Sequence, residues 1–184
     1  PDLASNHAPR VHEDAPSYFV QDERGCYHLP GKDPEGDAWH PDWPIIMVNY
    51  SDCLAYAAWL GAKDGHPYRL PSSMEWQKAA RGVDGRTYPW GYHFDATFCC
   101  MRDSKEGRAM PTPIGTFEPD TSPYGIRDMA GSVVEWTSSP SNQATPRDGV
   151  GTIDTRILEG SAYNSASFVC SLDFNMSSPV SFRH

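Results

Sequence analysis

Apolar and small side chains first recur at helical spacing in the stretch that follows residue 50. Four of them would share one face of a helix: Leu54, Ala57, Ala58 and Gly61. Ser51 and Asp52 come just before this face, and either side chain can accept from the free N–H groups of a first helical turn. The pattern therefore predicts a helix that opens near Ser51 or Asp52 and ends close to Gly61.

A second helix is predicted from residue 72 by its capping residues. The Ser72 hydroxyl can accept from the main-chain N–H three residues on, and Glu75 can reach back in the same way. One side of the following turns is apolar: Trp76, Ala79 and Ala80. Gly82 suits a left-handed position just past the helix end. We expect Trp76 to anchor this helix in the core.

The rest of the chain shows no helical period. Residues 45–48 (IIMV) predict a short strand, and further short apolar runs at 126, 133–134 and 157–158 are separated by turn signals. Residues 1–45 are polar and punctuated by Pro and Gly, so we expect an irregular segment pinned by Trp39 and Trp43. The predicted class is α+β, with two helices, small sheets and a high loop content.

Length and charge narrow the function classes. A chain of 184 residues suits one domain with one core. The formal net charge is −9 and no Lys/Arg-rich run occurs, so the electrostatic footprint of a nucleic-acid-binding protein is absent. No apolar stretch approaches the roughly 18 residues of a membrane span. The chain starts at Pro1, which is typical of an excised or processed piece.

Five cysteines are present: Cys26, Cys53, Cys99, Cys100 and Cys170. An odd number without C-x-x-C spacing fits reduced, buried thiols better than a disulfide framework, and it favours a cytoplasmic setting for this piece. We expect the vicinal Cys99 and Cys100 to point one inward and one outward on a strand-like segment. A redox or metal role for this pair is the alternative.

Six sequence blocks between residues 44 and 137 carry a family resemblance. They are 48–56 (VNYSDCLAY), 68–76 (YRLPSSMEW), 79–82 (AARG), 88–91 (YPWG), 113–117 (PIGTF) and 124–136 (YGIRDMAGSVVEW). In order and spacing they resemble the formylglycine-generating-enzyme/sulfatase-modifying-factor family, especially the domains that some bacteria fuse to Ser/Thr protein kinases. The resemblance implies a C-type-lectin-like fold over residues 1–184 as a single domain, without the family's extreme N-terminal and C-terminal strands, and it implies a kinase as an associated domain.

The resemblance also locates the family's catalytic cysteines near the C-terminus. The "RGGSF" block of the enzymes corresponds to residues 159–163 (EGSAY), where Glu159 replaces the usual Arg. The first catalytic cysteine then falls at Ser165, and Cys170 stands at the distance of the second. A serine hydroxyl neither binds Cu(I) nor enters a thiol redox relay, so the resemblance implies a protein that is not an enzyme. The alternative is a formylglycine-generating or related metal-dependent oxidase or oxygenase.

The last 25 residues have an unusual composition. From Gly160 to His184 the chain has seven Ser, three Phe and two Asn, and no Lys, Glu, Gln, Trp, Thr or Ile. This resembles the variable region of retroelement-diversified proteins on a C-type-lectin-like scaffold; an ordinary loop is the alternative. Small polar residues adapt to a partner, and aromatic residues add contact area at low entropy cost. We predict that residues 161–182 bind a protein or other macromolecular ligand through Ala162, Tyr163, Asn164, Ser165, Ser167, Phe168, Ser171, Asp173, Phe174 and Ser178.

Calcium is a further feature that the resemblance implies. Residues 131–135 (GSVVE) resemble a calcium-binding turn, with Glu135 as the carboxylate ligand and Ser132 in place of the common Asn. A hydrogen-bonding role for Glu135 inside the turn is the alternative. The surroundings of Ser165 and Cys170 separate the main hypotheses. Two thiols within disulfide reach, or three convergent metal ligands, would count against the binding domain. An exposed, shallow surface of Ser and aromatic side chains without such a cluster would count against the enzyme; a purely structural domain is a third alternative.

Overall fold

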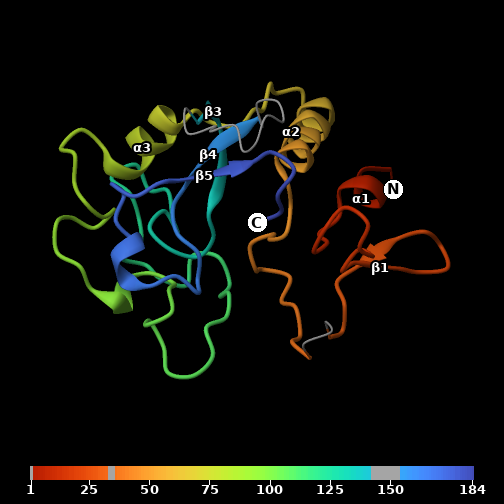
Figure 1. Cartoon of the computed structure of the whole chain (residues 1–184), viewed down its shortest axis with the longest axis horizontal. Helices are drawn as coiled ribbons and strands as arrows, with labels where there is room; N and C mark the ends of the chain where they lie inside the picture. Colours follow the sequence, from red (N-terminus) through yellow and green to blue (C-terminus); the bar gives the residue numbers. More distant parts are fainter. Residues whose placement is uncertain (1, 33–35, 142–153) are drawn as a thin grey trace, which may run out of the picture. The chain divides into compact units, whose positions relative to one another are not determined.

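The computed structural model describes residues 2–32, 36–141 and 154–184. These residues form three α-helices, two 3-10 helices and two small antiparallel sheets, so the predicted α+β class is confirmed (Figure 1). The chain divides into two compact units, one of residues 1–70 with 180–184 and one of residues 71–179. None of the described helices has both the length and the apolar character that a membrane-crossing helix needs.

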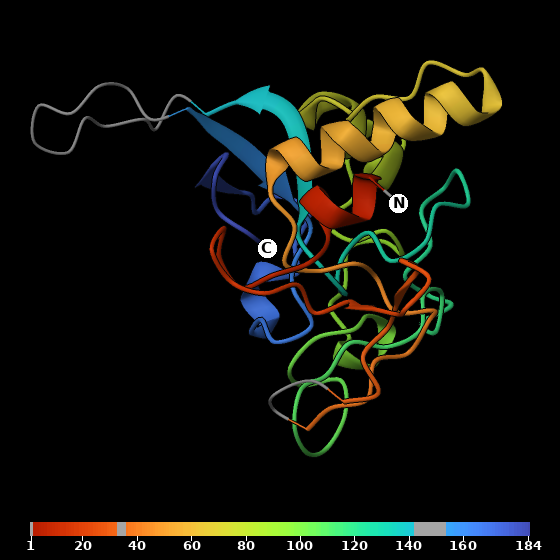
Figure 2. The ribbon, with the colours of Figure 1, turned by 90° about the vertical axis from the view of Figure 1, so that its right-hand side faces the viewer.

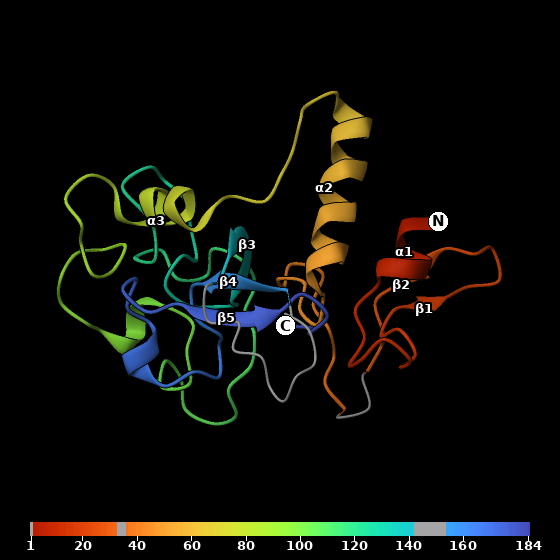
Figure 3. The ribbon, with the colours of Figure 1, turned by 45° about the horizontal axis from the view of Figure 1, so that its top comes forward.

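The first unit holds α1 (Asp2–His7), α2 (Tyr50–Asp64) and a small hairpin of β1 (Val20–Gln21) and β2 (Tyr27–His28). Figure 3 shows α2 along its length, with α1 and the hairpin in the same unit. Neither α1 nor the hairpin was predicted, because such short elements carry no apolar period. Trp39 does pin the irregular segment, since its ring stacks on Tyr18 at a centroid distance of 5.3 Å.

The predicted helix at residues 51–61 exists, but its ends differ from the prediction. Asn49 is the N-cap and accepts from the Asp52 N–H, while the Asp52 carboxylate accepts in return from the Asn49 N–H. The helix runs past Gly61 to Gly65, which adopts the left-handed conformation with a φ of 81°. Gly61 is required inside the helix for space, because a Cβ there would lie 2.7 Å from the His66 carbonyl oxygen.

The strand predicted at residues 45–48 does not form. Met47 has a φ of 60°, which interrupts an extended backbone. Val48 instead exchanges two main-chain hydrogen bonds with His184, of 3.0 and 3.1 Å, and the Tyr50 N–H donates to the Val180 carbonyl. The C-terminal residues are thereby fixed beside the start of α2.

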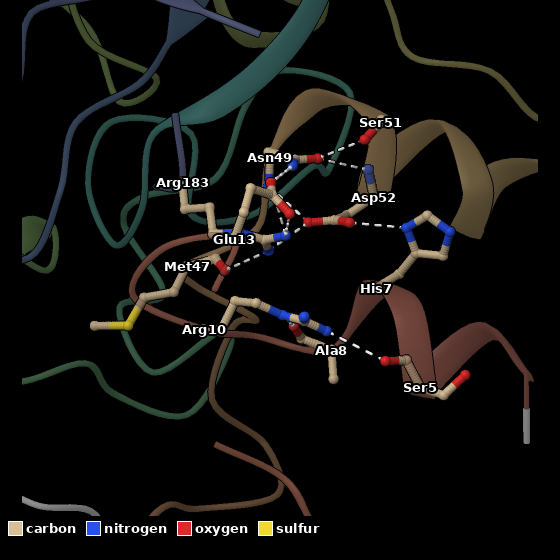
Figure 4. A network of polar contacts seen from close by, with 10 residues as sticks. All are labelled: Ser5, His7, Ala8, Arg10, Glu13, Met47, Asn49, Ser51, Asp52 and Arg183. Carbon is tan, nitrogen blue, oxygen red and sulfur yellow. Dashed lines mark hydrogen bonds and ion pairs between the residues drawn. The ribbon is translucent and has the colours of Figure 1, made fainter. Parts of the chain in front are cut away.

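A buried ionic network reinforces this junction of the first unit (Figure 4). The Asp52 carboxylate accepts from Arg183 at 2.6 Å and contacts the His7 ring at 2.8 Å. Arg183 also binds Glu13, which in turn accepts from the Asn49 side chain at 2.7 Å. The Arg183 and Asp52 side chains are only 2% and 4% exposed, so each neutralises a charge that water cannot reach. Residues from three distant parts of the chain are held together in this way.

The second unit contains α3 (Ser73–Arg81), whose ends match the prediction. Ser72 and Glu75 form the reciprocal capping box, and Gly82 follows the helix with a positive φ of 72°. Its apolar side packs in a core cluster of Trp76, Ala80, Met129 and Leu172, with Ala79 at the margin. The apolar side of α3 therefore joins the helix to segments roughly fifty and ninety residues further along.

A three-stranded antiparallel sheet lies in the same unit, in the order β3 (Glu135–Pro140), β4 (Thr155–Glu159) and β5 (Met176–Pro179). Leu158 of β4 is opposite Trp136 on one side and Met176 on the other. Figure 2 shows β3 and β4 side by side along the sheet. The 3-10 helices η1 (Ala96–Phe98) and η2 (Ser167–Val169) interrupt the long loops, as expected of short elements joined by irregular segments.

Candidate functional site

A polar stripe on α3 faces the C-terminal part of the second unit. Ser73, Gln77 and Arg81 follow one another at intervals of four residues and so share one side of the helix. Ser73 and Gln77 donate to the Glu159 carboxylate at the end of β4, and Arg81 donates to Asp173. A continuous series of side-chain contacts thus connects the buried Glu159 carboxylate with the exposed Asp173 carboxylate.

Gln77 is the centre of this stripe. Its Nε2 donates to Glu159 Oε2 at 2.6 Å and to the Leu172 carbonyl at 2.8 Å, and its Oε1 accepts from Arg81 at 3.3 Å. Glu159 is fully buried, and burial raises the pKa of its carboxyl group although the hydrogen bonds from Ser73 and Gln77 act against the rise. The amide of Gln77 therefore fastens both β4 and the loop after η2 to the helix.

Arg81 sits at the outer end of the stripe. Its Nε donates to the Arg86 carbonyl at 2.9 Å, and its Nη2 donates to the Gly85 carbonyl at 3.3 Å and to Asp173 Oδ1 at 2.5 Å. The Arg81 side chain is 22% exposed and that of Asp173 is 61% exposed. The guanidinium group is thus held by two main-chain oxygens and by one exposed carboxylate.

A pocket of about 600 Å³ opens over this end of α3. It is lined by Gln77, Lys78, Arg81, Gly82, Val83, Gly85, Leu172, Asp173 and Asn175. One wall therefore comes from α3 and the turn after it, and the other comes from the loop between η2 and β5. Two cations, two amides and one carboxylate give the pocket the polar groups that orient a ligand.

The predicted ligand-binding residues fall into three groups. Asn164 and Asp173 are exposed, while six are half-buried: Ala162, Tyr163, Ser165, Ser167, Ser171 and Phe174. Ser178 is buried within β5, and the side chain of Phe168 lies outside the described part of the structure. Among the nine whose side chains the structure describes, Asp173 alone lines the pocket.

Residues 162–165 form a tight turn next to this surface. The Ser165 N–H donates to the Ala162 carbonyl at 2.8 Å, and the Ser165 hydroxyl accepts from the Ala162 N–H at 3.2 Å. The Arg102 guanidinium group donates to the Asn164 carbonyl at 2.7 and 3.0 Å. The side chain at the position of the first catalytic cysteine is therefore occupied in closing a turn.

Cys170 lies among sulfur atoms rather than at the surface. Its Sγ is 3.8 Å from Met101 Sδ and 3.1 Å from the Ser161 hydroxyl, and Cys99 belongs to the same buried cluster. The exposed fractions of Cys99 and Cys170 are 0% and 1%. The neighbouring Cys170 thiol and burial both raise the pKa of Cys99, whereas the neighbouring Cys99 thiol lowers the pKa of Cys170. A second thiol thus stands beside Cys170, as the enzyme hypothesis requires, but neither thiol reaches solvent.

The prediction that Cys99 and Cys100 point in opposite directions, one of them outward, is wrong. Both are buried: Cys99 belongs to the cluster of Met101, Ala130 and Cys170, and the Cys100 Sγ lies 3.8 Å from the Met110 carbonyl. Each thiol packs against different residues of the second unit, and neither is exposed. All five cysteines are free thiols.

Glu135 accepts a hydrogen bond, as the alternative to calcium supposed, but from α3 and not from within the turn of residues 131–135. Its Oε2 accepts from the Trp76 indole N–H at 2.8 Å, and burial raises the pKa of its carboxyl group. Among the described residues, no group of three or more His, Cys, Asp or Glu side chains is arranged to hold a metal ion. Calcium binding at Glu135 stays a prediction.

The polar stripe of α3 is the part of the site that sequence reasoning missed. The helix was interpreted through its apolar side, yet Ser73, Gln77 and Arg81 stand four residues apart in the printed sequence. That spacing is a recognisable signal for a second, polar contact face. What the spacing does not contain is the identity of the partners, since Glu159 and Asp173 come from segments more than eighty residues away.

Two capped helices, small antiparallel sheets and long loops make up the α+β structure of the described residues. The chain belongs to the sulfatase-modifying factor enzyme 1-like domain family, whose model matches residues 12–184. The family resemblance of the six sequence blocks is therefore confirmed, and the match extends across both units.

Relatives with different activities are similar to this chain at almost the same level. "Inactive C-alpha-formylglycine-generating enzyme 2" of Bos taurus is 33% identical, over 79% of this chain and 47% of its own length. "Formylglycine-generating enzyme" of Thermomonospora curvata is 31% identical, over 76% and 50%. "Hercynine oxygenase" of Mycolicibacterium thermoresistibile is 34% identical, over 76% and 34%. The chain thus spans half or less of the length of these relatives.

Solved structures confirm the C-type-lectin-like fold. PvdO from Pseudomonas aeruginosa superposes with a TM-score of 0.68 at 23% identity, covering 90% of this chain and 66% of that one. Treponema denticola variable protein 1 superposes with a TM-score of 0.65 at 14% identity, covering 99% and 76%. At these identities the likeness concerns the fold alone.

Proposed function

We propose that this chain is a non-catalytic ligand-binding domain. It presents the loop of residues 162–175 and the adjoining pocket to a protein or other macromolecular ligand. The observation that carries the proposal is the separation of the thiols from the surface: Cys170 is buried against Cys99, while Asn164 and Asp173 on either side of it are exposed. A buried thiol cannot meet a bulky peptide substrate, whereas the exposed polar side chains can contact a partner.

The turn at Ser165 supports the same reading. The family resemblance puts the first catalytic cysteine at this position, and here a hydroxyl group closes a hydrogen bond with the Ala162 N–H. An enzyme of this type needs a reactive thiolate there, and serine does not provide one. The relatives agree with loss of activity as one outcome within the family, because one named inactive is as similar as those named for an enzyme.

We further infer that the binding loop belongs to the retroelement-diversified type. The Ser-rich, Lys-free composition of residues 160–184 supports this inference. The expected observation is a reverse-transcriptase gene near the coding sequence, with a template repeat that matches the codons for residues 160–184. A locus without either would overturn the inference while leaving ligand binding untouched. Association with a Ser/Thr kinase and calcium binding at Glu135 remain predictions.

Site-specific photo-crosslinking tests the binding proposal. A photoreactive amino acid at Asn164 is expected to crosslink one macromolecule from an extract of the source cells. The matched control places the same group at Met74, which is highly exposed on α3 but outside the pocket. The crosslinked molecule is then purified and titrated against the unmodified chain. Equal labelling from both positions, or no saturable binding of the purified molecule, would refute the proposal.

The enzyme remains the second candidate because of one observation, the presence of Cys99 and Cys170 in the same buried cluster. Incubation with a cysteine-containing sulfatase peptide and Cu(I) in air, followed by mass spectrometry, tests it. We expect the peptide cysteine to be unchanged. Conversion of that cysteine to an aldehyde by the unmodified chain, lost in Cys170→Ser, would establish the enzyme and overturn the binding-only function.

A further inference from the structure

The pocket over the end of α3 has two walls of different origin. The helical wall supplies Gln77, Lys78 and Arg81, and it is anchored by hydrogen bonds to Glu159 and to the turn at residues 85–86. The other wall consists of Leu172, Asp173 and Asn175, within the segment proposed above to bind ligands. A ligand that enters the pocket therefore meets a fixed cationic wall and a wall that belongs to the binding loop.

Arg81 is held so that one edge of its guanidinium group faces the pocket. Main-chain oxygens of Gly85 and Arg86 and the side-chain oxygen of Gln77 take the donors on the inner side. The remaining contact is the Asp173 carboxylate, which is 61% exposed and reaches Arg81 through one oxygen. Its other oxygen lies 3.5 Å from the Ser171 hydroxyl. An exposed ion pair of this kind contributes little to stability and exchanges readily.

The charges around the pocket determine which ligand group suits it. The C-terminal end of a helix by itself attracts cations, and Lys78 and Arg81 of the last turn of α3 satisfy that preference. Lys78 donates to the Gly82 carbonyl at 3.3 Å and lies 5.7 Å from the centre of the Tyr124 ring. The buried Glu159 carboxylate is also near Arg81, but its oxygens accept hydrogen bonds from Gln77 and Ser73. Among the described residues that line the pocket, Asp173 thus supplies the one carboxylate.

We propose that the pocket binds a carboxylate carried by the ligand, and that this group takes the place of Asp173 on Arg81. The planar guanidinium group matches a carboxylate with two parallel hydrogen bonds, and Lys78 adds a second cation at the rim. Asp173 then competes with the ligand carboxylate for Arg81, and the residue at position 173 determines how tightly an external anion binds. This inference deepens the proposed binding function and depends on it.

An acidic side chain and the C-terminal carboxylate of a peptide are two sources of such a group. Three probes distinguish them: N-acetyl-glutamate amide, with an acidic side chain; N-acetyl-glutamine, with a free terminal carboxylate; and N-acetyl-glutamine amide, with neither. Each is titrated into the ¹⁵N-labelled chain, and the amide signals of Gly82 and Gly85 in the pocket are followed. Binding of the first or second probe, and not the third, is the expected result.

Two variants make the test decisive. Asp173→Asn keeps the size of the side chain but releases Arg81, so the acidic probes are expected to bind about fivefold more tightly than to the unmodified chain. Adding Arg81→Gln to Asp173→Asn should abolish the gain. A well-dispersed amide spectrum of each variant serves as the folding control. If Asp173→Asn changes the affinities for the acidic and the neutral probes alike, or leaves all of them unchanged, the carboxylate site is refuted.

The outcome is separable from that of the proposed function. A partner that crosslinks at Asn164 while the acidic probes fail would leave the binding domain intact and remove only the carboxylate site. If the probes bind as expected but no macromolecule crosslinks, the carboxylate site is supported and the proposal of a macromolecular ligand is refuted. Raised ionic strength provides a further check, since it should weaken the binding of the acidic probes and should not change the response to the neutral probe.

Discussion

Two arginine–aspartate pairs, one in each unit, show how differently the same chemistry is used in this protein. Arg183 and Asp52 are 2% and 4% exposed and join the C-terminal residues to the start of α2 (Figure 4). Arg81 and Asp173 are 22% and 61% exposed and meet at the mouth of a pocket. Their distances are almost equal, at 2.6 and 2.5 Å, so geometry alone does not distinguish them.

Solvent exposure does distinguish the two pairs. A buried charge that loses its partner is left without water or a counter-ion, which makes the inner pair costly to break. An exposed pair is replaced by water at little cost, which leaves Arg81 ready for another carboxylate. The inner pair therefore serves the fold, and the outer pair is suited to exchange.

The largest expected effect comes from breaking the inner pair. Arg183→Ala removes the guanidinium partner of the buried Asp52 and leaves only the His7 ring and the Asn49 N–H beside its carboxylate. The free energy of unfolding of the first unit should therefore fall by about 3–5 kcal/mol. Urea unfolding, combined with hydrogen exchange of the α2 amides, measures the loss. Glu13→Gln is the matched control, because Glu13 binds the same Arg183 from an exposed position; it should cost about 1 kcal/mol or less. Equal losses in the two variants would contradict the distinction.

A buried carboxylate without a guanidinium partner among its hydrogen bonds sharpens the comparison. Asp120 is almost fully buried and accepts from the main-chain N–H groups of Ala130 and Gly131 at 3.0 and 3.2 Å. Burial raises its pKa to about 7, from 3.8 in an unfolded chain. The folded state therefore retains a proton that the unfolded state releases, and stability should fall as the pH rises from about 4 to 7.

The difference in pH dependence between the unmodified chain and Asp120→Asn measures this contribution. The unmodified chain should lose about 2–4 kcal/mol more of its unfolding free energy across that interval than the variant does. Glu135 and Glu159 also have raised pKa values and remain in both proteins, so their contribution cancels in the difference. Parallel stability curves would show that Asp120 is already ionised at pH 4.

Local sequence signals predicted the bounds of α3 better than those of α2. The Ser72–Glu75 box and Gly82 gave the bounds of α3, because a capping box depends only on residues within one turn. The same reasoning misplaced the cap of α2, where the capping residue is Asn49 and not Ser51 or Asp52. The strand expected at residues 45–48 does not form because Met47 adopts a positive φ. Val48 pairs instead with the C-terminal His184, a contact that no local pattern contains.

The candidate site shows the same limit. The C-terminal segment was identified from composition, and Asp173 does line the pocket. Composition did not distinguish Ser178 from the other predicted binding residues, although Ser178 is buried by its position in β5. Gln77 and Arg81 were visible as a four-residue repeat on α3, but their partners are set by tertiary folding. Composition therefore located one wall of the pocket and gave no information about the other.

The smallest expected effect is the most direct test of the comparison, because it measures both pairs in the same way. A double-mutant cycle of Arg81→Ala and Asp173→Ala isolates the coupling of the outer pair from the other bonds of Arg81. We expect a coupling free energy of about 0–1 kcal/mol in urea unfolding, falling further at high salt. The corresponding cycle of Arg183→Ala and Asp52→Ala should give a larger and less salt-sensitive value, since water and ions do not reach that pair. If the outer coupling equalled the inner one, Asp173 would be a fixed part of the fold, and Arg81 would not be free to accept a carboxylate from a ligand.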